Sequence, residues 1–160
     1  MTAPVLLLGY GNPSRGDDAL APLLLEKIAP FCDGRIELIT DFQLQIEHAL
    51  DLKQRDLVLF LDASVANQNA VEFVELKAIK DVSYSTHAMH PACVMQVYQD
   101  VEHNTAPPCF LLTMQAIEFE LGAGLSSKAE QSLEQGFMLL KQLITQPHLS
   151  VWQSLLSITA

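Results

Sequence analysis

The chain has 160 residues, 49% of them hydrophobic and 18% charged, which is the balance of one globular domain rather than of a disordered segment. Its formal net charge of −10 repels nucleic acid and anionic membranes, and attracts a metal cation or a basic protein segment. The 3 cysteines lie far apart in the sequence, which predicts free thiols in a reducing compartment. We therefore expect a single cytoplasmic domain over residues 1–160, with no nucleic-acid partner, no membrane partner and no signal peptide.

Apolar runs and amphipathic stretches alternate along the chain. The apolar runs, among them LVLFL, predict strands at 4–8, 35–40, 57–61, 71–76 and 109–114. Helical periodicity predicts helices at 17–29, 45–52, 90–101 and from 127 onward, followed by an amphipathic closing segment at 147–160. The long helix near the end carries a predicted capping box, in which Ser127 is followed by Glu130.

The run VEFVEL at 71–76 differs from the other strands because apolar and acidic residues alternate in it, as in a half-exposed edge strand. The connection that leads to it from 57–61 is too short for a crossover helix, so we expect this strand to run antiparallel to its neighbours. The other elements follow the βαβ rhythm of a doubly wound fold. The predicted fold is therefore an α/β three-layer sandwich, with a mostly parallel five-stranded sheet, one antiparallel strand and helices on both faces.

The loop after the first strand reads GYGNPSRGDD, a glycine turn that leads into a helix. Many α/β proteins hold a phosphate at this place, but a dinucleotide fingerprint needs a third glycine where this loop has Ser14. Asp17 and Asp18 stand where the phosphate would bind and would repel it. A nucleotide-binding, flavodoxin-like module is therefore disfavoured.

Further polar side chains follow the other strands, and the carboxyl ends of parallel strands meet at one sheet edge. They are Asp41, Asp62 and the histidines of STHAMHPAC, His87 and His90. Carboxylates and imidazoles gathered in this way predict a divalent metal site. Simpler roles remain open at this point, because Asp17 suits a helix N-cap and Asp62 suits a turn. The spacing of the two histidines does not decide which of them is a ligand.

Several segments resemble motifs of the hydrogenase maturation endopeptidases, which trim the C-terminal tail from the large subunit of nickel–iron hydrogenases. GYGNPSRGDDALAP is similar to the opening motif of that family, LFLDAS to its second motif and THAMHPA to its third. DFQLQIEHAL is similar to the segment after the second strand in one branch, and EFELGAGLS to a late signature. The resemblance spans residues 5–143, with the motifs at matching separations.

The resemblance implies that Asp18, Asp62 and His87 contact a metal, with Asp18 standing where some members carry glutamate. It implies catalytic roles for Asp18 and Asp62. Asp41 matches an acidic position of the family to which a part in cleavage is ascribed, so the resemblance implies a catalytic role for it. Phe42 and Gln43 follow Asp41, where other branches have a glycine pair. Nickel is implied to arrive bound to the substrate, so the protein itself is expected to hold no ion beyond an adventitious divalent one.

The function expected from this resemblance is removal of the C-terminal extension from a nickel-loaded large-subunit precursor, by a monomeric cytoplasmic endopeptidase. The attacking water is activated by the metal or a carboxylate, or the acidic residues act as base and acid without metal; the sequence leaves both routes open. No serine or cysteine has the context of a nucleophile. The alternative is a non-catalytic nickel-binding chaperone or sensor that uses the same ligands.

Overall fold

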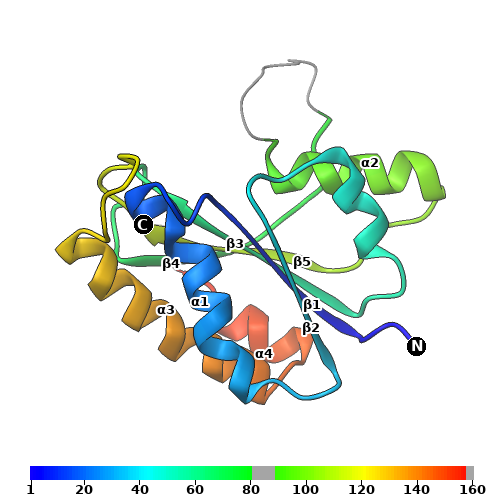
Figure 1. The fold of residues 1–160 in the computed structure, drawn as a ribbon. Coiled ribbons are helices and arrows are strands. Elements are labelled where there is room, and N and C mark those ends of the chain that lie inside the picture. Colours follow the sequence, from blue (N-terminus) through cyan, green and yellow to red (C-terminus); the bar gives the residue numbers. More distant parts are fainter. Residues whose placement is uncertain (81–88, 158–160) are drawn as a thin grey trace.

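A five-stranded sheet, in the order β2-β1-β3-β5-β4, forms the middle layer of the computed structural model, which describes residues 1–80 and 89–157 (Figure 1). The strands are β1 Val5–Tyr10, β2 Ile36–Asp41, β3 Leu57–Ser64, β4 Val71–Glu75 and β5 Cys109–Gln115. β1, β2, β3 and β5 are parallel, and β4 pairs with β5 in the antiparallel direction. The predicted fold class and the antiparallel edge strand are both confirmed.

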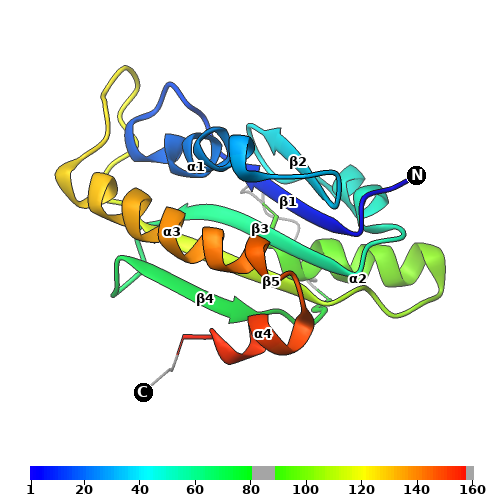
Figure 2. The ribbon, with the colours of Figure 1, turned by 90° about the horizontal axis from the view of Figure 1, so that it is seen from below.

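Helices cover both faces of this sheet (Figures 1 and 2). One face carries α1 Leu20–Ile28, α3 Ser127–Thr145 and α4 Leu149–Ser154, and the other carries α2 Pro91–Glu102 and the 3-10 segment η3 Ile46–Leu52. All six residues of β1 are buried, because alternate side chains enter the two cores; this explains its continuous apolar run. No helix within the described ranges is long and apolar enough to cross a membrane.

The closing segment is the helix α4, which packs over the antiparallel edge of the sheet. Trp152 is fully buried, and its ring lies 5.2 Å from that of Phe110 and 6.4 Å from that of Phe73, centroid to centroid. Its Nε1–H donates a hydrogen bond to the Leu143 carbonyl at 2.9 Å, so the buried indole has no unpaired donor. α4 thereby covers one face of β4 and holds the end of α3.

Two helix starts differ from the sequence-based expectation. The first helix begins with a 3-10 turn, η1 Gly16–Ala19, before α1 starts at Leu20. The N-cap of α3 is Ser126 rather than Ser127: the Ser126 Oγ accepts the N–H of Ala129 at 3.1 Å. The predicted capping box of Ser127 and Glu130 is therefore wrong, because the cap lies one residue earlier and Ala129 stands at the third helical position.

Candidate functional site

The carboxyl ends of β1 and β3 place a tyrosine and an aspartate side by side. The parallel register pairs Gly9 with Leu61, so Tyr10 and Asp62 are the next residues on neighbouring strands. The Tyr10 hydroxyl donates a hydrogen bond to the Asp62 carboxylate. The Asp62 carboxylate also accepts the N–H of Ala63, at 2.8 Å. The apolar strand β3 thus delivers a largely buried carboxylate to the sheet edge in a defined orientation.

The glycine turn after β1 brings Asp18 to the same place. Gly11 has a φ of +154°, and a side chain there would collide with the backbone carbonyl of Asp18. The next residue, Asn12, donates its backbone N–H to Asp18 Oδ2 at 2.7 Å. The G-x-G-N turn therefore serves to let the chain pass close to Asp18 and hold its carboxylate, rather than to bind a phosphate.

The charges of Asp18 and Asp62 repel each other. Burial, opposed by the Ala63 hydrogen bond and assisted by the charge of Asp18, raises the pKa of Asp62 to about 7. Burial and the charge of Asp62 likewise raise the pKa of Tyr10 well above its ordinary value, so the phenol stays protonated as a donor. A divalent cation between these two carboxylates would offset their mutual repulsion.

Asp17, the neighbour of Asp18, has a different role. It is fully buried, and its oxygens accept the N–H of Ile117 at 2.8 Å, the N–H of Ser126 at 2.8 Å and the Ser126 hydroxyl at 2.7 Å. Burial acts to raise the pKa of Asp17, but these hydrogen bonds outweigh it and hold that pKa below its usual value. Asp17 does not cap its own helix; it ties the loop between β5 and α3 to the start of η1.

Asp41 ends β2 and pairs with a histidine to which the sequence analysis gave no role. Its Oδ1 accepts the N–H of Phe42 at 2.7 Å, and its Oδ2 lies 3.2 Å from Nε2 of His48. His48 Nδ1 accepts the N–H of Gln45 at 2.8 Å, which assigns the proton of a neutral ring to Nε2 and makes it the donor to Asp41. This contact joins the end of β2 to η3 across the turn between them, and no periodicity in the sequence predicts it.

Asp41 does not join the Asp18–Asp62 pair. The register pairs it with Tyr10, and Asp62 lies beyond Tyr10 on the far side of β1. Two strand spacings, roughly 10 Å, therefore separate the backbones of Asp41 and Asp62. The catalytic role implied for Asp41 has no support from this placement.

The two histidines of the third motif are placed as follows. His90 is the N-cap of α2, as the predicted helix start implied, and its Nδ1 accepts the N–H of Ala92 at 3.0 Å. His87 lies outside the described residues, and its metal contact stays a prediction. Within residues 1–80 and 89–157, no three His, Cys, Asp or Glu side chains gather closely enough to hold a metal ion. Asp18 and Asp62 would therefore need further ligands to bind one.

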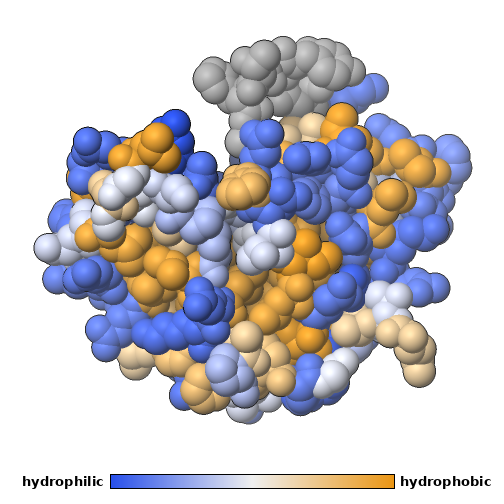
Figure 3. Space-filling model, viewed as in Figure 1, coloured by the Kyte–Doolittle hydropathy of each residue, from blue (hydrophilic) through white to orange (hydrophobic). Residues whose placement is uncertain are grey.

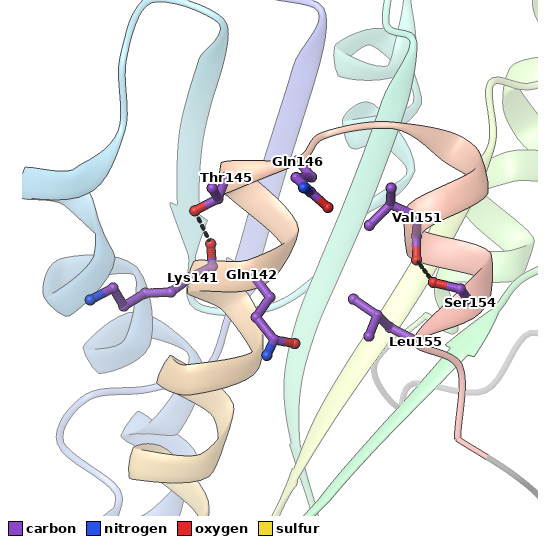
Figure 4. Close-up of a pocket in the computed structure, with 7 residues that line it drawn as sticks. All are labelled: Lys141, Gln142, Thr145, Gln146, Val151, Ser154 and Leu155. Atoms are coloured by element: carbon purple, nitrogen blue, oxygen red, sulfur yellow. Dashed lines mark hydrogen bonds between the residues drawn. The ribbon is translucent and has the colours of Figure 1, made fainter.

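Two of the hollows on the surface of the described residues differ in chemistry. One, of about 270 Å³, adjoins the site and is lined by Gly11, Pro13, Pro22, Thr40, Asp41 and Phe42. The other, of about 570 Å³, lies between the end of α3 and α4 (Figure 4). The hydroxyls of Thr145 and Ser154 at the larger hollow donate to carbonyls of their own helices, and the ammonium of Lys141 lies 4.6 Å from the centre of the Phe31 ring. The larger hollow therefore presents no acid, histidine or activated nucleophile.

Comparisons with known proteins show a shared fold. No protein-family model matches the sequence, and no curated protein matches it. The hydrogenase maturating endopeptidase HybD from E. coli superposes with a TM-score of 0.68 at 19% identity, over 85% of this chain and 88% of that one. The [NiFe] hydrogenase maturation protease HycI from Thermococcus kodakarensis KOD1 gives 0.67 at 22% identity, over 90% and 94%. An endopeptidase from Escherichia coli gives 0.69 at 18%, over 89% and 93%.

Proposed function

We propose that this protein is an endopeptidase that removes the C-terminal extension of a nickel–iron hydrogenase large-subunit precursor, acting as a monomer in the cytoplasm. One observation carries the proposal: the fold shared with solved maturation proteases brings Asp18 and Asp62 together at the carboxyl edge of the sheet. The three motif resemblances that include these two residues and His87 point the same way. The net charge of −10 favours a partner with basic segments.

In this proposal nickel is part of the substrate. Asp18 and Asp62 offer it carboxylate oxygens, and His87 offers an imidazole on the strength of the motif. The mutual repulsion of the two carboxylates is relieved when a cation lies between them, so the site binds a loaded precursor better than an empty one. The coordination that these residues leave open is filled by the precursor's own ligands.

Hydrolysis adds water across one peptide bond: the water oxygen bonds to the carbonyl carbon, the C–N bond breaks and the amine leaves with a proton. In the metal-free route Asp62 is the described group suited to move that proton, because its pKa of about 7 lets it accept and return a proton near neutral pH. Tyr10 holds the Asp62 carboxylate in place through its hydroxyl. In the metal-assisted route the cation would lower the pKa of Asp62, so there Asp62 would serve as a ligand and not as the carrier of that proton.

The test is to incubate metal-stripped protein with apo and with nickel-loaded precursor and to follow the C-terminus by mass spectrometry. We expect only the loaded precursor to become shorter, and expect no shortening with Asp62→Asn. Equal cutting of both precursors would contradict the dependence on nickel. Tight binding of the loaded precursor without any shortening would identify a chaperone or sensor instead.

A further inference from the structure

The smaller hollow beside the carboxylate pair is a pocket with one ionisable lining group. It lies between the glycine turn after β1 and the end of β2, and its walls are Gly11, Pro13, Pro22, Thr40, Asp41 and Phe42. Asp41 is the only residue of this lining with a titratable side chain. The Phe42 side chain is 68% exposed, and so its ring remains available for a ligand. On this face of the molecule, hydrophobic residues gather near the centre, with hydrophilic residues around them (Figure 3).

The Asp41 carboxylate is fixed in direction but not neutralised. The Phe42 N–H and the Nε2–H of His48 hold its two oxygens, at 2.7 Å and 3.2 Å. His48 is itself buried and anchored by the Gln45 N–H, so it cannot turn away without losing that bond. No lysine or arginine of the described part of the chain forms an ion pair with Asp41. A negative charge with 37% of its side chain exposed therefore faces a hollow whose other lining residues carry no charge.

We propose that this pocket is a specificity subsite for a basic side chain of the substrate peptide, in which Asp41 pairs with the cation and the Phe42 ring covers it. Carboxylate pairing and an aromatic face are the two features that recognise guanidinium and ammonium groups. Two prolines, a glycine and Thr40 form the remaining walls, and the prolines suit the methylene stem of such a side chain. The proposal rests on the proposed function and deepens it, since it assigns Asp41 to binding rather than to cleavage.

The distance along the sheet edge limits where in the peptide this basic residue lies. Asp41 and Asp62 flank Tyr10, and two strand spacings separate their backbones by roughly 10 Å. An extended peptide advances about 3.3–3.6 Å for each residue. A basic side chain in the pocket therefore belongs to a residue within about three positions of the bond that is cut near Asp62. His48 is a positioning residue, which acts through Asp41.

Steady-state kinetics on nickel-loaded precursor test the subsite. A contact that binds substrate and transition state equally raises KM and leaves kcat unchanged. We expect Asp41→Asn to raise KM about tenfold with kcat within about twofold of wild type, and His48→Gln to give a smaller rise of the same kind. Glu47→Gln, on the adjacent η3, is the matched control for a general loss of negative charge, and should leave KM unchanged. A fall in kcat at constant KM for Asp41→Asn would overturn the proposal.

A second measurement does not depend on cleavage. N-acetyl-arginine amide and the uncharged, nearly isosteric N-acetyl-citrulline amide are titrated separately into the protein, and amide shifts are followed by NMR. We expect shifts at residues 40–42 with the arginine probe alone, and none in Asp41→Asn. If the precursor is cut but the two probes act alike, the subsite is wrong. If the arginine probe binds selectively but no loaded precursor is cut, the proposed function is wrong and the cation pocket stands.

Discussion

Asp17 and Asp18 are adjacent in the sequence, yet their carboxylates lie in opposite electrostatic surroundings. Asp17 is enclosed by donors from Ile117 and Ser126, at distances of 2.7–2.8 Å. Asp18 accepts the Asn12 N–H at 2.7 Å and faces the charge of Asp62. A buried carboxylate with a full set of donors stabilises the fold, whereas two carboxylates that repel each other reduce stability until a cation binds. The comparison separates Asp17, which stabilises the loops around the site, from Asp18 and Asp62, the pair proposed to bind the cation.

The largest effect is expected at Asp62. Asp62→Asn keeps the size of the side chain but removes the charge that a cation needs, so the rate of precursor processing should fall by about two orders of magnitude or more. Circular dichroism checks that the variant is folded. Asp100→Asn, on the exposed end of α2, is the control and should process at the wild-type rate. A folded Asp62→Asn with full activity would remove Asp62 from the site.

Alanine variants of the two motif histidines extend the comparison to the proposed third ligand, His87. His90 is used at the N-cap of α2, so His90→Ala should cost about 1 kcal/mol of stability and leave most of the processing rate. His87→Ala should reduce processing by about two orders of magnitude. Both variants are assayed on one batch of loaded precursor. The reverse result would move the third ligand to His90.

The variants Asp17→Asn and Asp18→Asn test directly how the electrostatic surroundings of these two carboxylates differ. The Asp17 amide would point N–H groups at the donors of Ile117 and Ser126, so the free energy of unfolding should fall by about 2–4 kcal/mol. Asp18→Asn should leave stability unchanged or raise it, because it removes the repulsion with Asp62. Urea unfolding of both variants at pH 7.5 measures the difference. Equal losses would mean that the two residues share one structural role.

The pH dependence of stability tests the surroundings of Asp62 directly. The pKa of Asp62 is about 7 in the folded chain and about 3.9 in an unfolded one, so the folded state binds the proton more tightly. This group therefore lowers the free energy of unfolding as pH rises from about 4 to about 7, by roughly 1–3 kcal/mol. Asp62→Asn should remove that fall, making the variant more stable than wild type at pH 8 and similar to it at pH 4. Parallel pH profiles for the two proteins would show that the pKa of Asp62 is not raised in the folded protein.

The smallest expected effect concerns the two serines at the start of α3. Ser126 caps the helix and donates to Asp17, so Ser126→Ala should lower stability by about 1–2 kcal/mol. Ser127 is the first helical residue, and Ser127→Ala should change stability by less than about 0.5 kcal/mol. Thermal unfolding of the pair is sufficient, each variant serving as the other's control. A larger loss for Ser127 would restore the capping box expected from the sequence.

The sequence predicted those features that leave a local pattern. Continuous apolar runs identified β1 and β3, and the short connection after β3 identified β4 as antiparallel. It also placed Asp18 and Asp62 at one sheet edge, since strand ends fix where a chain emerges. The hydrogen bonds between Asp17 and Ser126 join residues 109 positions apart, and the contact of Asp41 with His48 closes across a turn. Such contacts depend on tertiary packing and have no periodicity to detect.

The close approach at Gly11 has a consequence for redesigning this protein. A side chain at that position would meet the backbone of Asp18 rather than the tip of its side chain. Residue 11 is therefore confined to glycine. At residue 18, by contrast, the side chain could be replaced by another with a different donor atom. Glutamate, histidine or cysteine at position 18 would retune the preference for hard or soft ions without rebuilding the turn. In the proposed metal site, the loop would therefore fix where the ligand stands, while the residue at position 18 would set which donor atom it offers.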